Sequence, residues 1–243
     1  MSEHAIKRSG GKVTRFGPVD TRTLVERVVD SIVEAAARGL ILPGDRVVEA
    51  EVARELNISR VPVREAFRHL ESQGIVVNTP YRGMRLMDVS VERIEQTLKV
   101  RMALETLTAE EVRQKAEAAP AVLAPLEDLV EEMRHAAEAE DRYALARLDT
   151  DFHREMCLIT GNDVLLKAWT PVSLQLTIIF GLSALQKECG AIVVEHEDIL
   201  EALRSDDAEA LAEIMRVHIF DQGKEVDHES FVARLRQGKR PAE

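Results

Sequence analysis

Apolar residues recur at helical spacing from Ser90 almost to the end of the chain, and this long stretch constrains the fold more than any other feature. A period of about 3.6 residues places them on one face of each helix, and no segment here alternates as a strand would. Residues typical of helix ends interrupt the pattern at four places, namely Pro120, Gly161-Asn162, Gly190 and Asp206-Asp207. The pattern predicts an antiparallel helical bundle with helices over residues 91–117, 120–139, 141–160, 162–187, 190–204 and 206–226.

The first 90 residues have a different organisation. Helical patterns cover residues 21–38, 49–56 and 60–73, with Ser59 at the N-cap of the third helix. Two short apolar runs, 75–77 and 84–87, then flank the turn residues 78–83 and predict a hairpin. Three helices followed by a hairpin outline a winged helix-turn-helix.

The predicted fold class is therefore mainly α: an N-terminal winged helix-turn-helix followed by an all-helical antiparallel bundle of six or seven helices. We expect the first domain to span residues 20–88 and the second residues 89–228. Residues 1–19 are expected to form a flexible basic tail, and residues 229–243 a C-terminal tail.

Charge is distributed unevenly along the chain. The net charge is −11, yet residues 1–90 carry 14 Lys/Arg against 12 Asp/Glu, whereas the remainder carries 18 against 31. An acidic body with a slightly basic head suits a protein that presents one end to a polyanion. We find no signal peptide and no apolar run near the roughly 18 residues needed to span a bilayer, so we expect a cytoplasmic protein with no membrane partner. Cys157 and Cys189 lack CxxC partners and are expected to be buried free thiols.

Three arginines give the third predicted helix a cationic face. Arg60, Arg64 and Arg68 fall at i, i+4 and i+8, so they share one side of the helix. Arginine pairs bidentately with guanine, and a helix N-terminus adds partial positive charge near phosphates. These features favour a recognition helix for double-stranded DNA; the alternative is a surface helix with a solvated basic edge.

Residues 40–88 resemble the winged-helix domain of GntR-family regulators. The resemblance is carried by Pro43-Gly44, Leu56-Asn57-Ile58-Ser59-Arg60, Pro62-Val63-Arg64-Glu65-Ala66 and Arg82-Gly83. It implies that Ser59, Arg60 and Arg64 contact the operator. It also implies that Arg82 and Gly83, at the wing tip, reach the minor groove or its phosphates.

Three histidines each lie beside the apolar stripe of a different predicted helix: His153, His196 and His218. Asp149 precedes His153 by one helical turn. If the three imidazoles converge inside the bundle, they form with this carboxylate a site for a borderline divalent ion. The alternative is three separate core histidines, each bonded to a backbone carbonyl.

Residues 91–225 resemble the helical effector domain (FCD domain) of the FadR-type GntR subfamily, in its metal-binding branch. The matching features are Arg101…Leu104-Glu105, Asp149…Phe152-His153, Glu195-His196 and His218. The resemblance implies that Asp149, His153, His196 and His218 are metal ligands. Zinc is the expected divalent metal ion, with nickel and manganese as alternatives.

The same resemblance implies a small organic acid as effector, bound at the ion. Arg101 is the expected counter-charge to its carboxylate, although an ion pair with Glu105 inside the bundle is the alternative. Residues 174–186 are uncharged, and the polar side chains in and beside this stretch are further candidate effector contacts: Ser173, Gln175 and Thr177.

The sequence thus predicts a ligand-responsive transcription regulator, not an enzyme. We expect a homodimer that binds a palindromic operator and represses transcription until a small carboxylate binds. One alternative is a metal sensor, in which the ion itself is the signal. Another is a metalloenzyme acting on a carboxylate, but no evident general base accompanies the predicted ligands.

Overall fold

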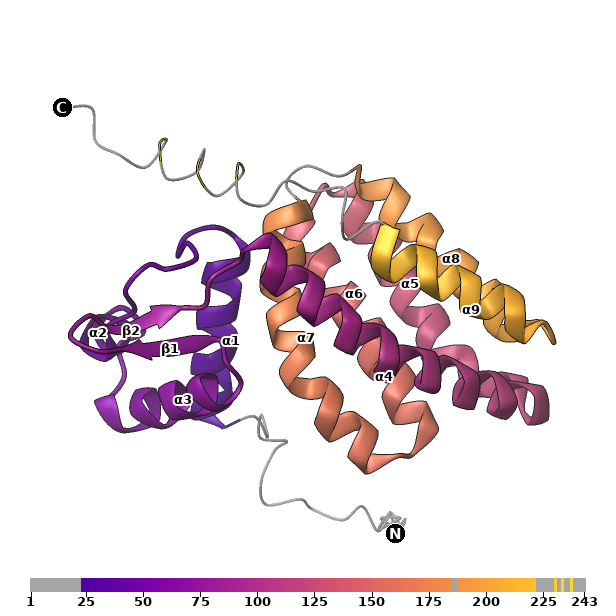
Figure 1. Ribbon diagram of the computed structural model, residues 1–243, viewed down its shortest axis with the longest axis horizontal. Helices are drawn as coiled ribbons and strands as arrows, with labels where there is room; N and C mark the ends of the chain where they lie inside the picture. Colours follow the sequence, from indigo (N-terminus) through magenta and orange to yellow (C-terminus); the bar gives the residue numbers. More distant parts are fainter. Residues whose placement is uncertain (1–22, 185–187, 222–229, 231–232, 234–236, 238–243) are drawn as a thin grey trace, which may run out of the picture.

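The computed structural model describes residues 23–184 and 188–221, together with residues 230, 233 and 237. It consists of a small head, residues 23–88, and a helical body, residues 90–221, which lie side by side (Figure 1). The predicted tail over residues 1–19 lies outside the described residues. So do most of the predicted C-terminal tail and the ends of the helices predicted over 162–187 and 206–226.

The head is a winged helix-turn-helix, as predicted. It contains α1 (Leu24–Ala37), α2 (Glu49–Glu55) and α3 (Arg60–Ser72), followed by the antiparallel strands β1 (Val76–Thr79) and β2 (Gly83–Leu86). A capping box starts α1, where the Thr23 hydroxyl accepts from the Glu26 amide and the Glu26 carboxylate accepts from the Thr23 amide. Apolar side chains of α1, α3 and the hairpin form the core of the head, among them Ile32, Phe67 and Leu86.

The body contains six α-helices in its described residues: α4 (Val91–Ala118), α5 (Ala124–Glu138), α6 (Arg142–Thr160), α7 (Asp163–Ala184), α8 (Cys189–Arg204) and α9 (Ala208–Arg216). This confirms the predicted bundle. Two boundaries differ from the prediction: residues 120–123 form a short 3-10 helix before α5, and α9 ends at Arg216 in a π-helical turn, Val217–Asp221. Cys157 and Cys189 are free and buried, as predicted.

Helix α7 corrects the expectation that the chain has no apolar run near the length needed to span a bilayer. Its segment Asp163–Leu182 has a mean hydropathy of 1.4 and is long and apolar enough to cross a membrane by length and composition. In the structure this helix packs against α4 and α6 of the body and against α1 of the head (Figure 1). A central position between helices accounts for its apolar character without a bilayer.

Helix α7 also joins the body to the head. A Cβ atom built on Gly181 would lie only 2.5 Å from the Ala37 Cβ, so the α1 and α7 backbones approach closely at this point. Six residues earlier, the Gln175 amide nitrogen donates to the Gln73 carbonyl at 3.1 Å, and its oxygen accepts from Arg93 Nη2 at 2.9 Å. Since Arg93 belongs to the body, the head is held on this helix by the close packing at Gly181 and by the hydrogen bond from Gln175 to Gln73.

Candidate metal centre and nucleic-acid interface

The four predicted metal ligands lie together inside the body. Asp149 and His153 come from α6, His196 from α8 and His218 from the π-helical turn after α9. Each offers one ligand atom, all of these atoms lie within 4.8 Å of one another, and all four residues are buried. Residues up to 69 positions apart in the chain thus form one compact donor group.

The spacing of the donor atoms suits a single ion. His153 Nε2 lies 3.0 Å from His218 Nε2, and His196 Nε2 lies 3.3 Å from Asp149 Oδ1. Two donors that each lie about 2.1 Å from a common ion are roughly 3.0–3.4 Å apart at octahedral or tetrahedral angles. The residues present therefore fit a divalent metal ion.

The opposite ring nitrogen of each histidine faces an acceptor. His196 Nδ1 lies 2.7 Å from the Ile192 carbonyl and donates to it, His153 Nδ1 lies 3.0 Å from Glu105 Oε2, and His218 Nδ1 lies 3.6 Å from Glu195 Oε2. Protons on the Nδ1 atoms leave the Nε2 lone pairs for the centre of the cluster. Among the described residues, several buried atoms here form no hydrogen bond of normal geometry: His196 Nε2, His153 Nδ1, His218 Nδ1 and Glu105 Oε2. Of these, His196 Nε2 is directed at another proposed ligand, Asp149, which suits two donors of one metal ion.

The ionisation states also suit a metal. Burial opposes ionisation of Glu105 and Asp149, but neighbouring Arg101 and the histidines outweigh it, so the Glu105 pKa is about 2 and the Asp149 pKa lies well below its usual value. Burial lowers the pKa of His153 and brings that of His218 to about 4. Ionised carboxylates and neutral imidazoles are the forms that bind metals.

The position of Arg101 is compatible with both roles expected from the sequence, an ion pair with Glu105 and a counter-charge to an effector carboxylate. Its Nε donates to Glu105 Oε1 at 2.8 Å, and both side chains are about 1% exposed, so the ion pair inside the bundle is present. Its Nη2 also lies 2.7 Å from His153 Nε2 and 3.2 Å from His218 Nε2. The guanidinium group is thus at the cluster, where an anion bound beside the ligands would meet it.

The three polar residues predicted as further effector contacts do not share one place. Thr177 is buried, and its hydroxyl lies 3.0 Å from that of Thr150, the neighbour of Asp149 in sequence. Ser173 is buried and donates to the Thr170 carbonyl. The Gln175 amide lies at the junction of head and body, where it bonds to Gln73 and Arg93.

Sequence reasoning gave Glu105 and Glu195 no role at the metal ligands. Their carboxylates face His153 and His218 in the structure. The i, i+4 spacing of Arg101 and Glu105 signalled their ion pair, but pairing with a histidine on another helix depends on tertiary packing. Trp169 also escaped notice; its ring centroid lies 6.2 Å from that of His153.

The proposed DNA-reading face of α3 is free of the body. Arg60, Arg64 and Arg68 are exposed, whereas the opposite side of the helix is buried in the head through Val63, Ala66, Phe67 and Leu70. Arg64 Nε lies 3.7 Å from Glu49 Oε2, and Arg68 Nη1 lies 2.7 Å from Glu65 Oε1. Both pairs are largely exposed and therefore weak enough to exchange for phosphate or base contacts.

Ser59 and the wing complete this surface. Ser59 occupies the N-cap position of α3, but its side chain makes no capping hydrogen bond, so the hydroxyl remains exposed. Arg82 is exposed in the turn between β1 and β2, and Gly83 begins β2 with φ of 75°. Tyr81 beside them is fully exposed at φ of 63°, a feature of the wing tip that sequence reasoning missed.

Family models match both halves of the chain. Residues 24–86 match the model described as "Bacterial regulatory proteins, gntR family", and residues 96–221 match the FCD domain. The chain is a GntR-family transcriptional regulator with an FCD domain. This GntR regulator is also similar to other transcription regulators. Two of them are named as transcriptional repressors, not as enzymes.

One similar protein is the "Probable D-xylose utilization operon transcriptional repressor" of Paenarthrobacter nicotinovorans. It is 29% identical over 82% of this chain and 87% of its own length. Another is the "HTH-type transcriptional repressor RspR" of Escherichia coli (strain K12), 26% identical over 74% of this chain and 78% of its own length.

Solved structures share the fold of this GntR regulator. The E. coli McbR/YncC structure has a TM-score of 0.68 at 19% identity and covers 90% of this chain and all of its own. A putative transcriptional regulator GntR from Rhodococcus sp. RHA1 has a TM-score of 0.64 at 20% identity, covering 89% of this chain and 99% of its own.

Proposed function

We propose that this regulator is a repressor that binds a palindromic operator as a homodimer in the cytoplasm and senses a small carboxylate through a metal-containing pocket. The observation that carries the sensing role is the buried group of Asp149, His153, His196 and His218 with the Arg101 guanidinium beside it. Two relatives named as repressors support the direction of control.

In the proposed DNA-binding role, α3 reads bases in the major groove and the wing contacts the neighbouring backbone. Ser59, Arg60, Arg64 and Arg68 of α3 and Arg82 and Gly83 of the wing are the proposed contacts. Their exposure supports this assignment. A two-fold axis between subunits would present two such heads to equivalent half-sites, which is why we propose a palindromic operator.

In the proposed sensing role, the four ligands hold a divalent ion, zinc in the first instance, with nickel or manganese as alternatives. One carboxylate and three imidazoles form a donor set suited to these ions. A bound ion would supply a Lewis-acidic position for a carboxylate oxygen. Arg101 and the buried hydroxyls of Ser173 and Thr177 would contact the rest of the effector.

A metal-sensing role is the second candidate, and one observation favours it. Four protein donors complete a tetrahedral zinc shell and leave no position open, as in structural zinc sites. An octahedral ion would instead leave two positions for water or an effector. Coordination number therefore separates the two functions.

The test is operator retention by the metal-loaded protein during titration with small carboxylates, compared with titration by a chelator alone. A duplex selected from a random pool by the protein itself serves as the operator. If an acid releases the duplex at constant metal content, the acid-sensing proposal stands; release by chelator alone would support the metal sensor. A protein that selects no duplex would contradict the DNA-binding role.

A further inference from the structure

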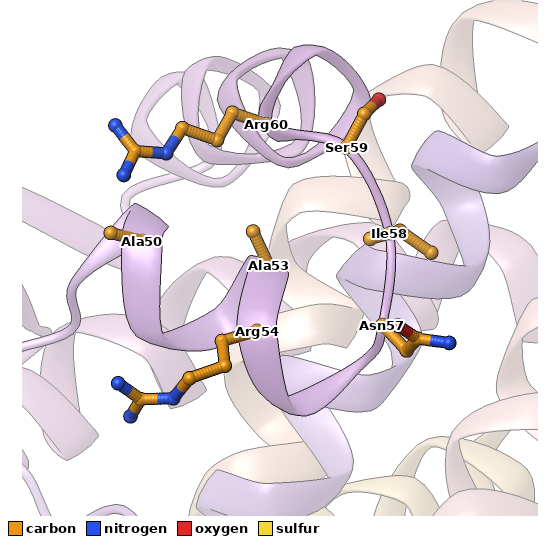
Figure 2. A pocket seen from close by; sticks show the side chains of 7 residues that line it. All are labelled: Ala50, Ala53, Arg54, Asn57, Ile58, Ser59 and Arg60. Atoms are coloured by element: carbon orange, nitrogen blue, oxygen red, sulfur yellow. The ribbon is translucent and has the colours of Figure 1, made fainter.

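The DNA-facing side of the head contains two adjoining hollows. One, of about 490 Å³, lies between α2 and the start of α3, and Arg54 and Arg60 line it (Figure 2). The other, of about 290 Å³, lies between α2 and the base of the wing, and Arg46 and Arg60 line it. Both share Ala50 and Arg60, so together they run from α2 past the start of α3 to the wing.

In the first hollow, the long side chains of Arg54 and Arg60 are separated by the short side chains of two alanines. Figure 2 shows the guanidinium groups of Arg54 and Arg60 on the same side of the first hollow, with the methyl group of Ala50 near them and that of Ala53 farther in. Because alanine side chains are short, the surface between the two arginines lies close to the helix backbone. An extended anionic chain can therefore approach both guanidinium groups at once.

Arg46 lines the second hollow, beside the wing. Its backbone forms an isolated bridge with Arg85 of β2, which fixes it against the strand. Its Nε would lie 3.4 Å from a Cβ atom built on Gly83, so the side chain passes close to the wing turn. Arg46 and Arg54 thus each line one of the two hollows, and Arg60 lines both.

The electrostatics distinguish these residues from the arginines farther along α3. Arg64 and Arg68 each pair with a glutamate, whereas Arg46, Arg54 and Arg60 form no ion pair with any carboxylate in the part of the chain that the structure describes. Glu49 lines the second hollow, but its carboxylate is directed to Arg64. Glu51 and Glu55, also on α2, line neither hollow.

We propose that Arg46 and Arg54 bind backbone phosphates of the DNA next to Arg60, which makes the two adjoining hollows one continuous phosphate track. This inference rests on the proposed DNA-binding function and extends it to two residues that sequence reasoning left without a role. Guanidinium groups form strong charge-assisted hydrogen bonds with phosphate oxygens. Phosphate contacts position a protein on DNA and carry no base information directly, so these two arginines set affinity and register.

The test is the salt dependence of DNA binding by Arg46→Ala, Arg54→Ala and the wild-type protein. Two duplexes of equal length are used, one selected from a random pool by the wild-type protein and one of random sequence. Each substitution is expected to weaken binding to both duplexes by the same factor. The slope of log K against log salt concentration should become shallower by about 0.9 for each phosphate that the variant no longer binds, so by about 1.8 for a dimer with both heads bound.

Two further variants calibrate this measurement. Arg154→Ala removes the same charge from an exposed position on α6 of the body and should leave the slope unchanged. Arg60→Ala should reduce the preference for the selected duplex, because Arg60 is a proposed base contact. Circular dichroism of each variant confirms that these exposed substitutions leave the fold intact.

A slope for Arg46→Ala or Arg54→Ala equal to that of Arg154→Ala overturns the phosphate track. So does a reduced preference for the selected duplex with an unchanged slope, since that result marks a base contact. Failure of the DNA-binding proposal looks different: the wild-type protein would bind neither duplex.

Discussion

Glu105 organises two buried groups at the proposed metal centre. Its Oε1 accepts from Arg101 Nε at 2.8 Å, and its Oε2 lies 3.0 Å from His153 Nδ1. The carboxylate therefore holds the guanidinium group and orients a proposed ligand imidazole. Partners that orient ligand histidines tune metal affinity almost as strongly as the ligands themselves.

Replacing Glu105 by glutamine is expected to weaken metal binding about 10–100-fold, because the amide lacks the charge that holds His153 and Arg101 in place. Competition with a chromophoric chelator measures this affinity. Glu138→Gln is the matched control, since Glu138 faces the exposed His135 at the surface and should not alter metal affinity.

The buried Arg101 also loses its anionic partner in Glu105→Gln, so the free energy of unfolding should fall by about 3–5 kcal/mol. If that variant does not fold, Glu195→Gln tests the same principle at the less buried partner of His218. The orienting role would be contradicted if Glu105→Gln and Glu195→Gln, each folded, both bound the metal with wild-type affinity.

The four proposed ligands could be singled out from the sequence because each histidine lies beside an apolar stripe and Asp149 precedes His153 by one helical turn; the resemblance then implied all four as metal ligands. The roles of Glu105 and Gln175 could not be predicted in this way. Glu105 faces a histidine on another helix, and Gln175 faces the backbone of the head. Helical periodicity gives the side of a helix on which a residue lies but not which helix packs there.

At the scale of the elements, the turn after α9 shows the limit of periodicity. The helical pattern predicted one helix over residues 206–226, yet the α-helix ends at Arg216 and His218 lies in a π-helical turn. A π turn rotates the following side chains relative to a continuous α-helix, and such turns are frequent at functional sites. The 3-10 helix over residues 120–123 is a second departure, whereas the joints at Gly161-Asn162 and Asp206-Asp207 fall where these residues predicted them, because they act locally on the backbone.

The close crossing of α1 and α7 gives a prediction at the same scale. Gly181→Ala would place a methyl group 2.5 Å from the Ala37 Cβ and 2.9 Å from the Ala37 carbonyl oxygen. We expect the free energy of unfolding to fall by about 1–3 kcal/mol as the two helices are forced apart. Chemical denaturation measures this change.

Gly190→Ala provides the control for this substitution. Gly190 lies in the first turn of α8, and a Cβ atom there meets nothing within 4 Å among the described residues. This variant should be neutral or slightly more stable, because alanine favours a helix over glycine. Equal effects of the two substitutions would show that the crossing of α1 and α7 tolerates the added volume.

At the scale of the whole molecule, α7 contacts both proposed functional regions. Phe180 lies under the Arg101 guanidinium at 5.1 Å, and the adjacent Gly181 packs on α1 of the head. Gln175 of the same helix bonds to the end of α3. A shift of α7 would therefore reach the proposed recognition helix directly.

Gln175→Ala is expected to loosen the head on the body, because it removes the hydrogen bond to the Gln73 carbonyl of the head at a cost of about 1 kcal/mol. Amide hydrogen exchange should become faster in α1 and in the last turn of α3, while exchange in α6 and α8 stays as in the wild type. Gln114→Ala, on the exposed side of α4, should change neither region. Exchange in the head at the wild-type rate would indicate that helix packing alone fixes its position.

The metal content of the purified protein tests the central claim most directly. Mass spectrometry of metals after dialysis should find about one divalent ion per chain in the wild-type protein and in His135→Ala, whose imidazole is exposed. His196→Ala should retain far less, because it removes a nitrogen donor from the buried group. A wild-type protein without a bound ion, or a His196→Ala variant with full metal content, would contradict the assignment of this cluster as a metal centre.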